Sequence, residues 1–374
     1  MSGSIFGTQF RVSTFGESHG RALGAVIDGC PAGLPLEEKD IQVYLDRRKP
    51  GQSHFTTARN EADAVKILSG VFEGKTTGTP IALLIENTDQ HSGDYSAIKE
   101  VYRPGHADVT YDEKYGFRDY RGGGRSSGRE TAARVAAGAV AAKLLQTFGI
   151  SVTAFTSSIG GVDCNRFDLD EIRRNPLCMP DQEAAEKAAA LLEERINEKD
   201  SAGGTITCIA DHLPAGLGEP VFDKLDADLA KAMLSIGAVK GFEIGSGFAV
   251  ATAELSRGSL TNDPFFMKDG HITKTSNHAG GVLGGISDGS PLIFCVAVKP
   301  TPSIARPQHT VNKNGENVEI EVKGRHDPVI VPRAVVVVEC MTALVLADAL
   351  LRNATSRLSY LQKIYPLQED APSL

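Results

Sequence analysis

The sequence repeats part of itself, and this repetition constrains the fold more than any other feature. Residues 27–34 and residues 209–217 both end in Pro-Ala-Gly-Leu. In each copy an apolar strand pattern precedes the turn and an amphipathic helix pattern follows it. Further along, residues 78–85 (GTPIALLI) resemble residues 289–296 (GSPLIFCV), each a turn that leads into a buried strand. Self-similarity of this kind indicates a chain built from two related units.

Two long apolar helices complete the repetition. Residues 129–148 and 333–351 are rich in Ala, Val and Leu nearly all round the helix, so both helices should be buried. Because similar elements recur in one order, we favour an ancient duplication over chance similarity of short apolar strings. The predicted fold is α+β, with halves at about 10–150 and 200–355 related by a pseudo-twofold. The two apolar helices would be central, with strands outside them.

The chain has no low-complexity linker that would separate independent domains. Residues 165–200 form an excursion between the halves, and the charged pattern of 181–199 within it predicts a solvated helix. The tail, 356–374, is short. We therefore expect one domain over residues 1–374.

Charge and composition exclude several functional classes. The 374 residues hold 39 Lys and Arg against 47 Asp and Glu, a net charge of −8. Such a balance disfavours a nonspecific binder of nucleic acid or of anionic membranes. The six cysteines are scattered, with no C-x-x-C pair for zinc or redox chemistry. The N-terminus has no secretory signal pattern, and no uncharged apolar run approaches the length of a membrane span. These features predict a cytoplasmic protein.

A glycine- and arginine-rich segment precedes the first apolar helix. Gly122-Gly123-Gly124 and Ser126-Ser127 lie within it, and Ser127 and Glu130 have the spacing of a capping box at the helix start. A helix N-terminus presents free N–H groups, and guanidinium forks match phosphate oxygens. We therefore predict a wall for a phosphate-bearing anion, although a glycine turn with solvated arginines remains the alternative. The arginines concerned are Arg118, Arg121, Arg125, Arg129 and Arg134.

Histidines occupy two loops that could serve this site. His106 follows a Pro-Gly turn in residues 103–108, which makes it a candidate proton donor near neutral pH. His19 lies in Gly16-Glu17-Ser18-His19-Gly20, between two strand patterns and so at a hairpin tip. Ser18 and His19 are adjacent on an extended chain and should point to opposite sides, which weakens a nucleophile–base pair. A histidine that faces phosphate is equally consistent.

Other loops carry weaker signals. Asp327, in Gly324-Arg325-His326-Asp327-Pro328, could exchange a proton if buried, or could pair with Arg325 and shape the loop. Residues 299–303 end a buried strand, and residues 277–285 form a glycine-dense loop without the spacing of a dinucleotide fingerprint. Both could line a flat cofactor or be plain loops. Arg48 ends the first amphipathic helix, where it could bind an anion or compensate the helix dipole.

Taken together, these segments resemble the chorismate synthase family. Residues 16–20 resemble its first signature, residues 103–108 with 119–127 its second, and residues 324–328 its third. The similarity runs through nearly the whole chain in the right order. It implies a β-α-β sandwich with antiparallel sheets and a lyase that converts 5-enolpyruvylshikimate 3-phosphate to chorismate and phosphate. The family requires reduced FMN but performs no net oxidation.

The resemblance also implies roles for individual residues. His19 is similar to the general acid that assists phosphate departure, and His106 to the histidine that protonates or steadies reduced flavin near N1. Asp327 is similar to the carboxylate that helps to take a proton from flavin N5. Substrate or flavin contacts are implied for Ser18, Arg48, Arg103, Arg129 and Arg325. Flavin contacts are implied for Arg125, Ser126, Ser127, Gly237, Ala238, Gly284, Lys299, Pro300, Thr301, Pro302 and Ser303.

The chain departs from the family pattern at two positions. Many bacterial members have arginine in place of His54, and some have asparagine in place of Gly237. Fungal relatives that reduce their own flavin carry extra sequence that this chain lacks. The resemblance therefore implies a monofunctional enzyme whose FMN is reduced by an external NAD(P)H-dependent reductase. It also implies a homotetramer, with no metal, nucleic acid or membrane partner.

Two rivals from other classes remain at this point. A metal-dependent phosphohydrolase could use His106, Asp108, His326 and Asp327, although arginines that line a site compete with a divalent cation. A non-enzymatic anion- or nucleotide-binding module would leave the separate His and Asp loops unexplained.

Overall fold

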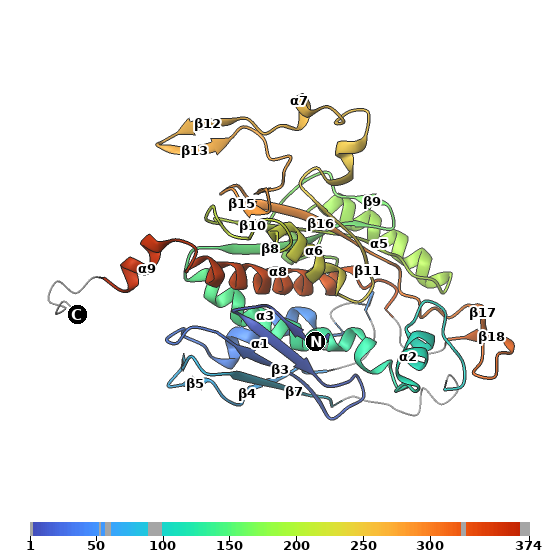
Figure 1. The fold of residues 1–374 in the computed structure, drawn as a ribbon. Helices are drawn as coiled ribbons and strands as arrows, with labels where there is room; N and C mark the ends of the chain where they lie inside the picture. The colour runs from blue at the N-terminus through green and yellow to red at the C-terminus, as the bar shows by residue number, and fades with distance from the viewer. Residues whose placement is uncertain (1–2, 52–53, 57–60, 89–98, 323–326, 367–374) are drawn as a thin grey trace.

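The computed structural model describes residues 3–51, 54–56, 61–88, 99–322 and 327–366. Two five-stranded antiparallel sheets enclose a layer of helices (Figure 1). The first sheet has the order β1 (Ile5–Phe6), β2 (Arg11–Phe15), β3 (Ala22–Asp28), β7 (Ile81–Glu86) and β4 (Val65–Ile67). The second has the order β11 (Val239–Ile244), β16 (Leu292–Val298), β10 (Gly204–Asp211), β8 (Ser151–Ile159) and β9 (Val162–Asp163).

Alternation of apolar side chains explains why each sheet covers the helices with one face. In β7, Ile81, Leu83 and Ile85 are buried while the residues between them are partly exposed. In β16, Leu292 and Phe294 follow the same alternation. A strand that buries every second side chain packs one face on the core and leaves the other to polar residues or solvent.

Two helices occupy the centre of the layer between the sheets. They are α3 (Thr131–Gln146) and α8 (Val331–Asn353), which pack against each other. Gly138 allows their close approach, because a Cβ at this position would lie 2.4 Å from Cys340 Cβ. By length and composition α8 could cross a membrane, but 83% of its most apolar window is buried inside the protein. It is the core helix of the fold.

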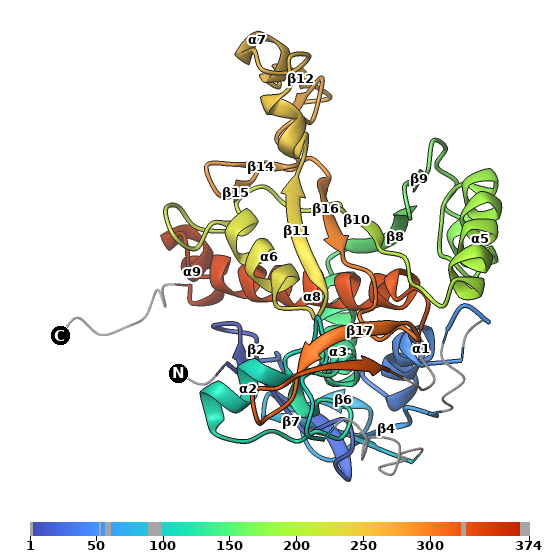
Figure 2. The same ribbon diagram turned by 90° about the vertical axis from the view of Figure 1, so that its right-hand side faces the viewer.

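Further helices extend the layer and its surroundings. Helix α1 (Glu38–Arg48) packs on α3, and α6 (Leu225–Leu234) packs on α8. Strands β12 (Phe265–Lys268) and β13 (His271–Lys274) form a hairpin, labelled in Figure 1, and Figure 2 shows β12 and α7 (Gly258–Thr261) projecting beyond the second sheet. The remaining α-helices and strands are β5 (Val71–Phe72), β6 (Lys75–Thr76), α2 (Asp108–Tyr115), α4 (Glu171–Arg174), α5 (Gln182–Asn197), β14 (Val282–Leu283), β15 (Ile286–Ser287), β17 (Pro307–Val311), β18 (Asn317–Glu321) and α9 (Leu358–Ile364).

The structure confirms the α+β class, the antiparallel sheets and the central apolar helices. The two sheets share a strand order, β2-β3-β7-β4 in one and β8-β10-β16-β11 in the other. In each set of four, the strand that comes last along the chain lies between the second and the third. This correspondence is what a duplication requires, and the duplication itself stays a prediction. The charged helix predicted over 181–199 is α5, with Asp181 as its N-cap.

The predicted start of the first apolar helix is wrong in detail. Gly128–Glu130 form a 3-10 turn, and α3 begins only at Thr131. Ser127 does cap the turn, since its side chain accepts from the backbone N–H of Arg129. Glu130 does not complete a capping box, because its carboxylate accepts from Arg134 Nε at 3.0 Å. The salt bridge within the helix competes with the cap for the same side chain.

Candidate active site

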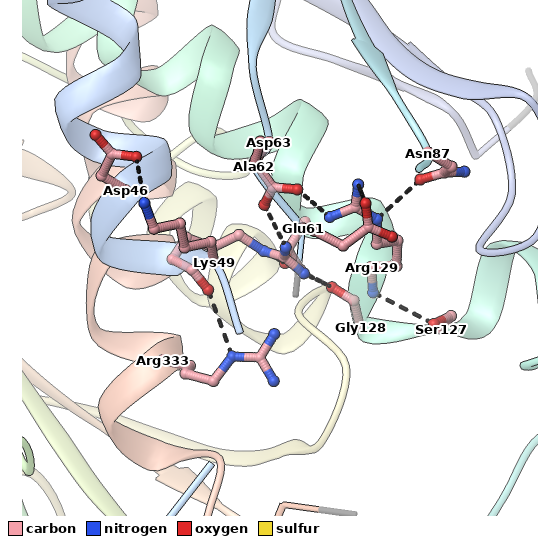
Figure 3. A network of polar contacts seen from close by, with 12 residues as sticks. Asp46, Lys49, Glu61, Ala62, Asp63, Asn87, Ser127, Gly128, Arg129 and Arg333 are labelled. Carbon is pink, nitrogen blue, oxygen red and sulfur yellow. Dashed lines mark hydrogen bonds and ion pairs between the residues drawn. The ribbon is translucent and has the colours of Figure 1, made fainter. Parts of the chain in front are cut away.

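A buried carboxylate holds together two of the arginines that the sequence marked for substrate binding. Asp63 Oδ2 accepts from Arg48 Nη1 at 3.0 Å, and Asp63 Oδ1 forms a short ion pair with Arg129 Nη1 (Figure 3). The side chain of Asp63 is 0% exposed, and those of the two arginines are 4% exposed. Burial lowers the pKa of Arg48 to about 10, although Asp63 opposes that shift. The group is therefore a tightly packed ionic cluster.

Further contacts place the two guanidinium groups. Arg48 also donates to Thr131 Oγ1 at 3.2 Å and to the carbonyl of Gly128 at 3.0 Å, which ties it to the start of α3. Arg129 Nε donates to Asn87 Oδ1 at 2.9 Å, and Glu61 lies 3.8 Å from Arg129 Nη2. Arg129 Nη2 is buried and has no hydrogen-bond acceptor among the described residues. It is a donor that a ligand oxygen could satisfy.

The loop with Ser18 and His19 joins β2 to β3, as predicted for a hairpin tip. Asn87 donates to the carbonyls of Glu17 and Gly20, which fixes this loop beside Arg129. The prediction that Ser18 and His19 point to opposite sides is wrong. A Cβ on Gly122 would lie 2.5 Å from the His19 ring and 2.9 Å from Ser18 Oγ, so both side chains face Gly122. The chain turns here and is not extended, which removes the strand alternation.

Arg103 lies next to the same glycine run. Its guanidinium forms a bidentate pair with Asp108, with both N···O distances at 2.8 Å. A Cβ on Gly123 would lie 3.9 Å from Arg103 Nη2. Asp108 also faces Arg118 at 3.8 Å, and these arginines lower the pKa of Asp108 against the opposing effect of burial. The bidentate fork holds Arg103 in one orientation.

His106 forms the next part of the site. Its Nε2 lies 2.8 Å from Ser303 Oγ, and its Nδ1 lies 2.9 Å from the carbonyl of Pro104. Burial and the charge of Arg103 lower the pKa of His106 to about 4. The imidazole is therefore neutral near pH 7, and its role as a proton donor stays a prediction. Residues 299–303 lie against this loop: Lys299 Nζ donates to Gly105 O at 2.8 Å, and a Cβ on Gly105 would lie 2.7 Å from Pro302 Cβ.

Asp327 approaches the arginine cluster from the start of α8. Its Oδ2 lies 2.7 Å from Arg333 Nη1, and Arg333 Nε donates to the backbone carbonyl of Arg48 at 3.4 Å. The sequence suggested Arg325 as a partner of Asp327, and that pairing stays a prediction; among the described residues Asp327 pairs with Arg333, on the helix that follows. Arg325 itself, for which a ligand contact was predicted, lies outside the described residues, as does His326.

The five arginines of the predicted wall all have partners within the protein, and the wall itself stays a prediction. Each guanidinium is engaged within the protein: Arg118 with Asp112, Arg121 with Asp119, Arg125 with Thr14 and Gly16, Arg129 with Asp63, and Arg134 with Glu130 and Ser235. Buried guanidinium groups require acceptors, and several come from segments distant in sequence. Arg48, Arg103 and Arg129 lie around the His19 loop and Gly122–Gly124, and their binding of an anion stays a prediction.

The positions marked for flavin are brought together only in part. Ala238 O accepts from the backbone N–H of Lys299 at 2.9 Å, which joins residues 237–238 to the 299–303 segment. Pro300 lies against Gly203, and Thr301 O accepts from Ser201 Oγ. Ser126 caps the carbonyl of Gly123. Gly284 lies in the β14–β15 hairpin, beside the start of α6, and no contact seen among the described residues joins it to the other flavin positions.

One cavity lies elsewhere. A volume of about 350 Å³ is lined by residues that include Lys274, Asn277 and Asp288. Its cation is already paired, since Lys274 Nζ lies 2.7 Å from Asp288 and 3.4 Å from Asp263. The converging arginine and histidine side chains make the stronger candidate for an active site.

Comparisons with known proteins agree on one family. The family model described as "Chorismate synthase" matches residues 10–351. A chorismate synthase of Lachnospira eligens is 61% identical over 367 residues, which cover 98% of this chain and 100% of that protein. A chorismate synthase of Agathobacter rectalis is 60% identical, over 98% of this chain and 99% of its own. A structure titled "Crystal Structure of Chorismate Synthase" superposes with a TM-score of 0.76, at 34% identity and with 96% of each chain covered.

Proposed function

This chain belongs to the chorismate synthase family, and on that premise we propose how its site carries out the family's reaction. The protein is a carbon–oxygen lyase of aromatic amino acid biosynthesis. It converts 5-enolpyruvylshikimate 3-phosphate to chorismate by a 1,4-elimination: the C–O bond to phosphate breaks, a proton leaves C6, and a second ring double bond forms. The observation that carries the proposal is the meeting of Arg48, Arg129 and the His19 loop at one buried cluster.

Binding of the substrate's carboxylates and phosphate falls to Arg48, Arg103, Arg129 and Ser18. Support comes from their fixed positions, since Asp63 and Asp108 orient the three guanidinium groups before a ligand arrives. Pre-organised donors lose little entropy on binding and stabilise charge that develops during the reaction. The unsatisfied Nη2 of Arg129 is the donor best placed to gain an acceptor from the substrate.

Reduced FMN fits the residues at the 299–303 segment. Burial and nearby Lys240 both lower the pKa of Lys299, so two cations share a space that an anion such as the FMN phosphate would favour. Thr301 Oγ1 is buried without a hydrogen-bond partner among the described residues, and around Gly237 and Gly284 none of them would contact an added Cβ within 4 Å. Reduced FMN supplies electron density that weakens the allylic C–O bond. The residues that would hold it are Arg125, Ser126, Ser127, Gly237, Ala238, Gly284, Lys299, Pro300, Thr301, Pro302, Ser303 and Arg325.

Proton transfer is assigned to His19 and Asp327, and a positioning role to His106. His19 would donate a proton to the departing phosphate oxygen, since it lies on the loop tied to Arg129. His106, kept neutral by burial, would act through its hydrogen bond with Ser303 and steady that segment. Asp327 would accept a proton, and its ion pair with Arg333 holds the carboxylate at the edge of the cluster.

The wider predictions belong here as well. We propose that the two halves arose by duplication and fold as one domain, that the protein is cytoplasmic, and that an external NAD(P)H-dependent reductase supplies its reduced flavin. A homotetramer is supported by exposed apolar side chains on the β12–β13 hairpin, among them Phe265, Met267 and Ile272. Sedimentation of the full chain measures the assembly directly.

An anaerobic assay tests the proposed activity. Incubation of the protein with 5-enolpyruvylshikimate 3-phosphate and chemically reduced FMN should give chorismate and phosphate, and oxidised FMN alone should give neither. The metal-dependent phosphohydrolase makes the opposite prediction, because phosphate release would then be independent of flavin and abolished by a chelator. The structure already disfavours this rival, since Asp108 is committed to Arg103 and Asp327 to Arg333.

A further inference from the structure

Asn87 connects two parts of the site through one side chain. Its amide nitrogen donates to the carbonyl of Glu17 at 3.1 Å and to that of Gly20 at 2.8 Å. Its amide oxygen accepts from Arg129 Nε at 2.9 Å. The residue is 9% exposed and follows directly on β7, where its backbone N–H donates to the carbonyl of Arg21. Figure 3 shows the side chain turned toward Arg129.

We propose that Asn87 is a positioning residue that holds the His19 loop in register with Arg129. This inference rests on the roles given above to His19 and Arg129. The carbonyls of Glu17 and Gly20 flank Ser18 and His19, so the two hydrogen bonds fix the loop on both sides of the histidine. Two backbone hydrogen bonds also hold the loop: the N–H of Gly20 donates to the carbonyl of Glu17 at 3.1 Å, and the N–H of Ser18 donates to the carbonyl of Gly124 at 3.4 Å.

Only an amide of this size satisfies the arrangement. The amide nitrogen donates to two carbonyl oxygens, and the amide oxygen accepts from a guanidinium. The arrangement therefore needs two donors and one acceptor on the same short side chain. Serine at this position is too short to reach both carbonyls. Aspartate would keep the acceptor for Arg129 but would place a carboxylate against two carbonyl oxygens.

The two partners of Asn87 differ in their remaining support. Arg129 stays fixed by Asp63 when Asn87 is shortened, because that ion pair is buried and independent of the amide. The His19 loop loses two hydrogen bonds at once. Loss of Asn87 should therefore misplace the proton donor more than the anion site, and a small misplacement can lower kcat by a factor of ten or more.

Asn87→Ser provides the first test, with steady-state kinetics under anaerobic conditions and reduced FMN. We expect kcat to fall by at least about tenfold while KM for 5-enolpyruvylshikimate 3-phosphate changes less than about threefold. Asn175→Ser is the matched control. Its amide also donates to two carbonyls, those of Glu171 at 2.9 Å and Met179 at 2.8 Å, but in the excursion between the halves. The control should keep both kinetic constants.

A double-mutant cycle with His19→Asn separates positioning from a general structural role. If Asn87 acts through His19, Asn87→Ser should lower kcat by less than about twofold in the His19→Asn background. The same tenfold loss in both backgrounds would overturn the inference. If Asn87→Ser does not fold, Asn87→Asp is used in the same cycle, with a raised KM expected from the added negative charge. Wild-type protein that makes no chorismate would refute the proposed function instead, whereas active wild type with an unchanged Asn87→Ser refutes only this inference.

Discussion

Asp63→Asn removes one negative charge from the centre of the arginine cluster and changes little else. Asparagine is nearly the same size, and it tolerates the left-handed backbone of this position, where φ is +47°. The amide of asparagine keeps one oxygen acceptor, so either Arg48 or Arg129 can keep a hydrogen bond to this side chain. Neither arginine keeps it as a charged partner. The substitution therefore leaves buried guanidinium charge without its counter-charge.

The magnitude follows from the burial of the pair. Removal of one partner from a buried ion pair costs about 3–5 kcal/mol, and the remaining hydrogen bond places this variant at about 3 kcal/mol. The lowered pKa of Arg48, about 10, shows that the interior disfavours its charge even with Asp63 present. For one domain of 374 residues, a loss of this size should lower Tm by about 4 °C. Because both guanidinium groups lose a fixed partner, KM for the substrate should rise at least about tenfold.

Thermal unfolding and anaerobic kinetics measure the two effects. Asp348→Asn is the control, since Asp348 Oδ1 accepts from the backbone N–H groups of Thr8, Gln9 and Phe10 and touches no arginine of the cluster. The control should lower Tm and leave KM unchanged. If Asp63→Asn keeps KM within about twofold, the cluster does not place the substrate arginines and the reasoning fails.

Three further outcomes are expected. His106→Ala and Asp327→Ala should retain FMN, measured by titration, but lose most turnover; wild-type rates in either variant would remove its proposed role. Because the folded pKa of His106 lies below the unfolded value, the stability it contributes is present above about pH 6.5 and is lost as pH falls toward 4. Tm between pH 7 and 4 should therefore fall less steeply in His106→Gln, and equal slopes would contradict this. Gly105→Ala should lower Tm and kcat through its clash with Pro302, whereas Gly116→Ala, with φ also positive at +80° and open space around it, should change Tm only modestly and kcat not at all.

Local patterns in the sequence were sufficient to predict several main elements of the fold. The alternation in β7 and β16, the all-round apolar pattern of α8 and the charged pattern of α5 each depend on neighbours along the chain. They predicted the strands and helices to within a few residues. The 3-10 turn before α3 was missed because Glu130 pairs with Arg134, and sequence alone does not decide between two partners for one side chain.

The sequence was enough to identify the arginines of the candidate site, but not the side chains that hold these arginines in place. Arg48, Arg103 and Arg129 were identified, but Glu61, Asp63 and Asn87 were not, because the hydrogen bonds that use them join separate segments. The missed signal was a shortage of counter-charge, since five arginines near two acids in one segment require carboxylates from elsewhere. Glu61 and Asp63, which lie just before β4, were the available source of these carboxylates. The ion pair of Asp327 with Arg333 on α8 was missed for the same reason.

The central claim is that this site eliminates phosphate with reduced FMN present but not consumed. It is tested most directly by the number of chorismate molecules formed per reduced FMN in the absence of oxygen. The account predicts many turnovers per flavin, with equal amounts of chorismate and phosphate and with the flavin still reduced at the end. Oxidation of one flavin for each product, or phosphate release without flavin, would contradict it.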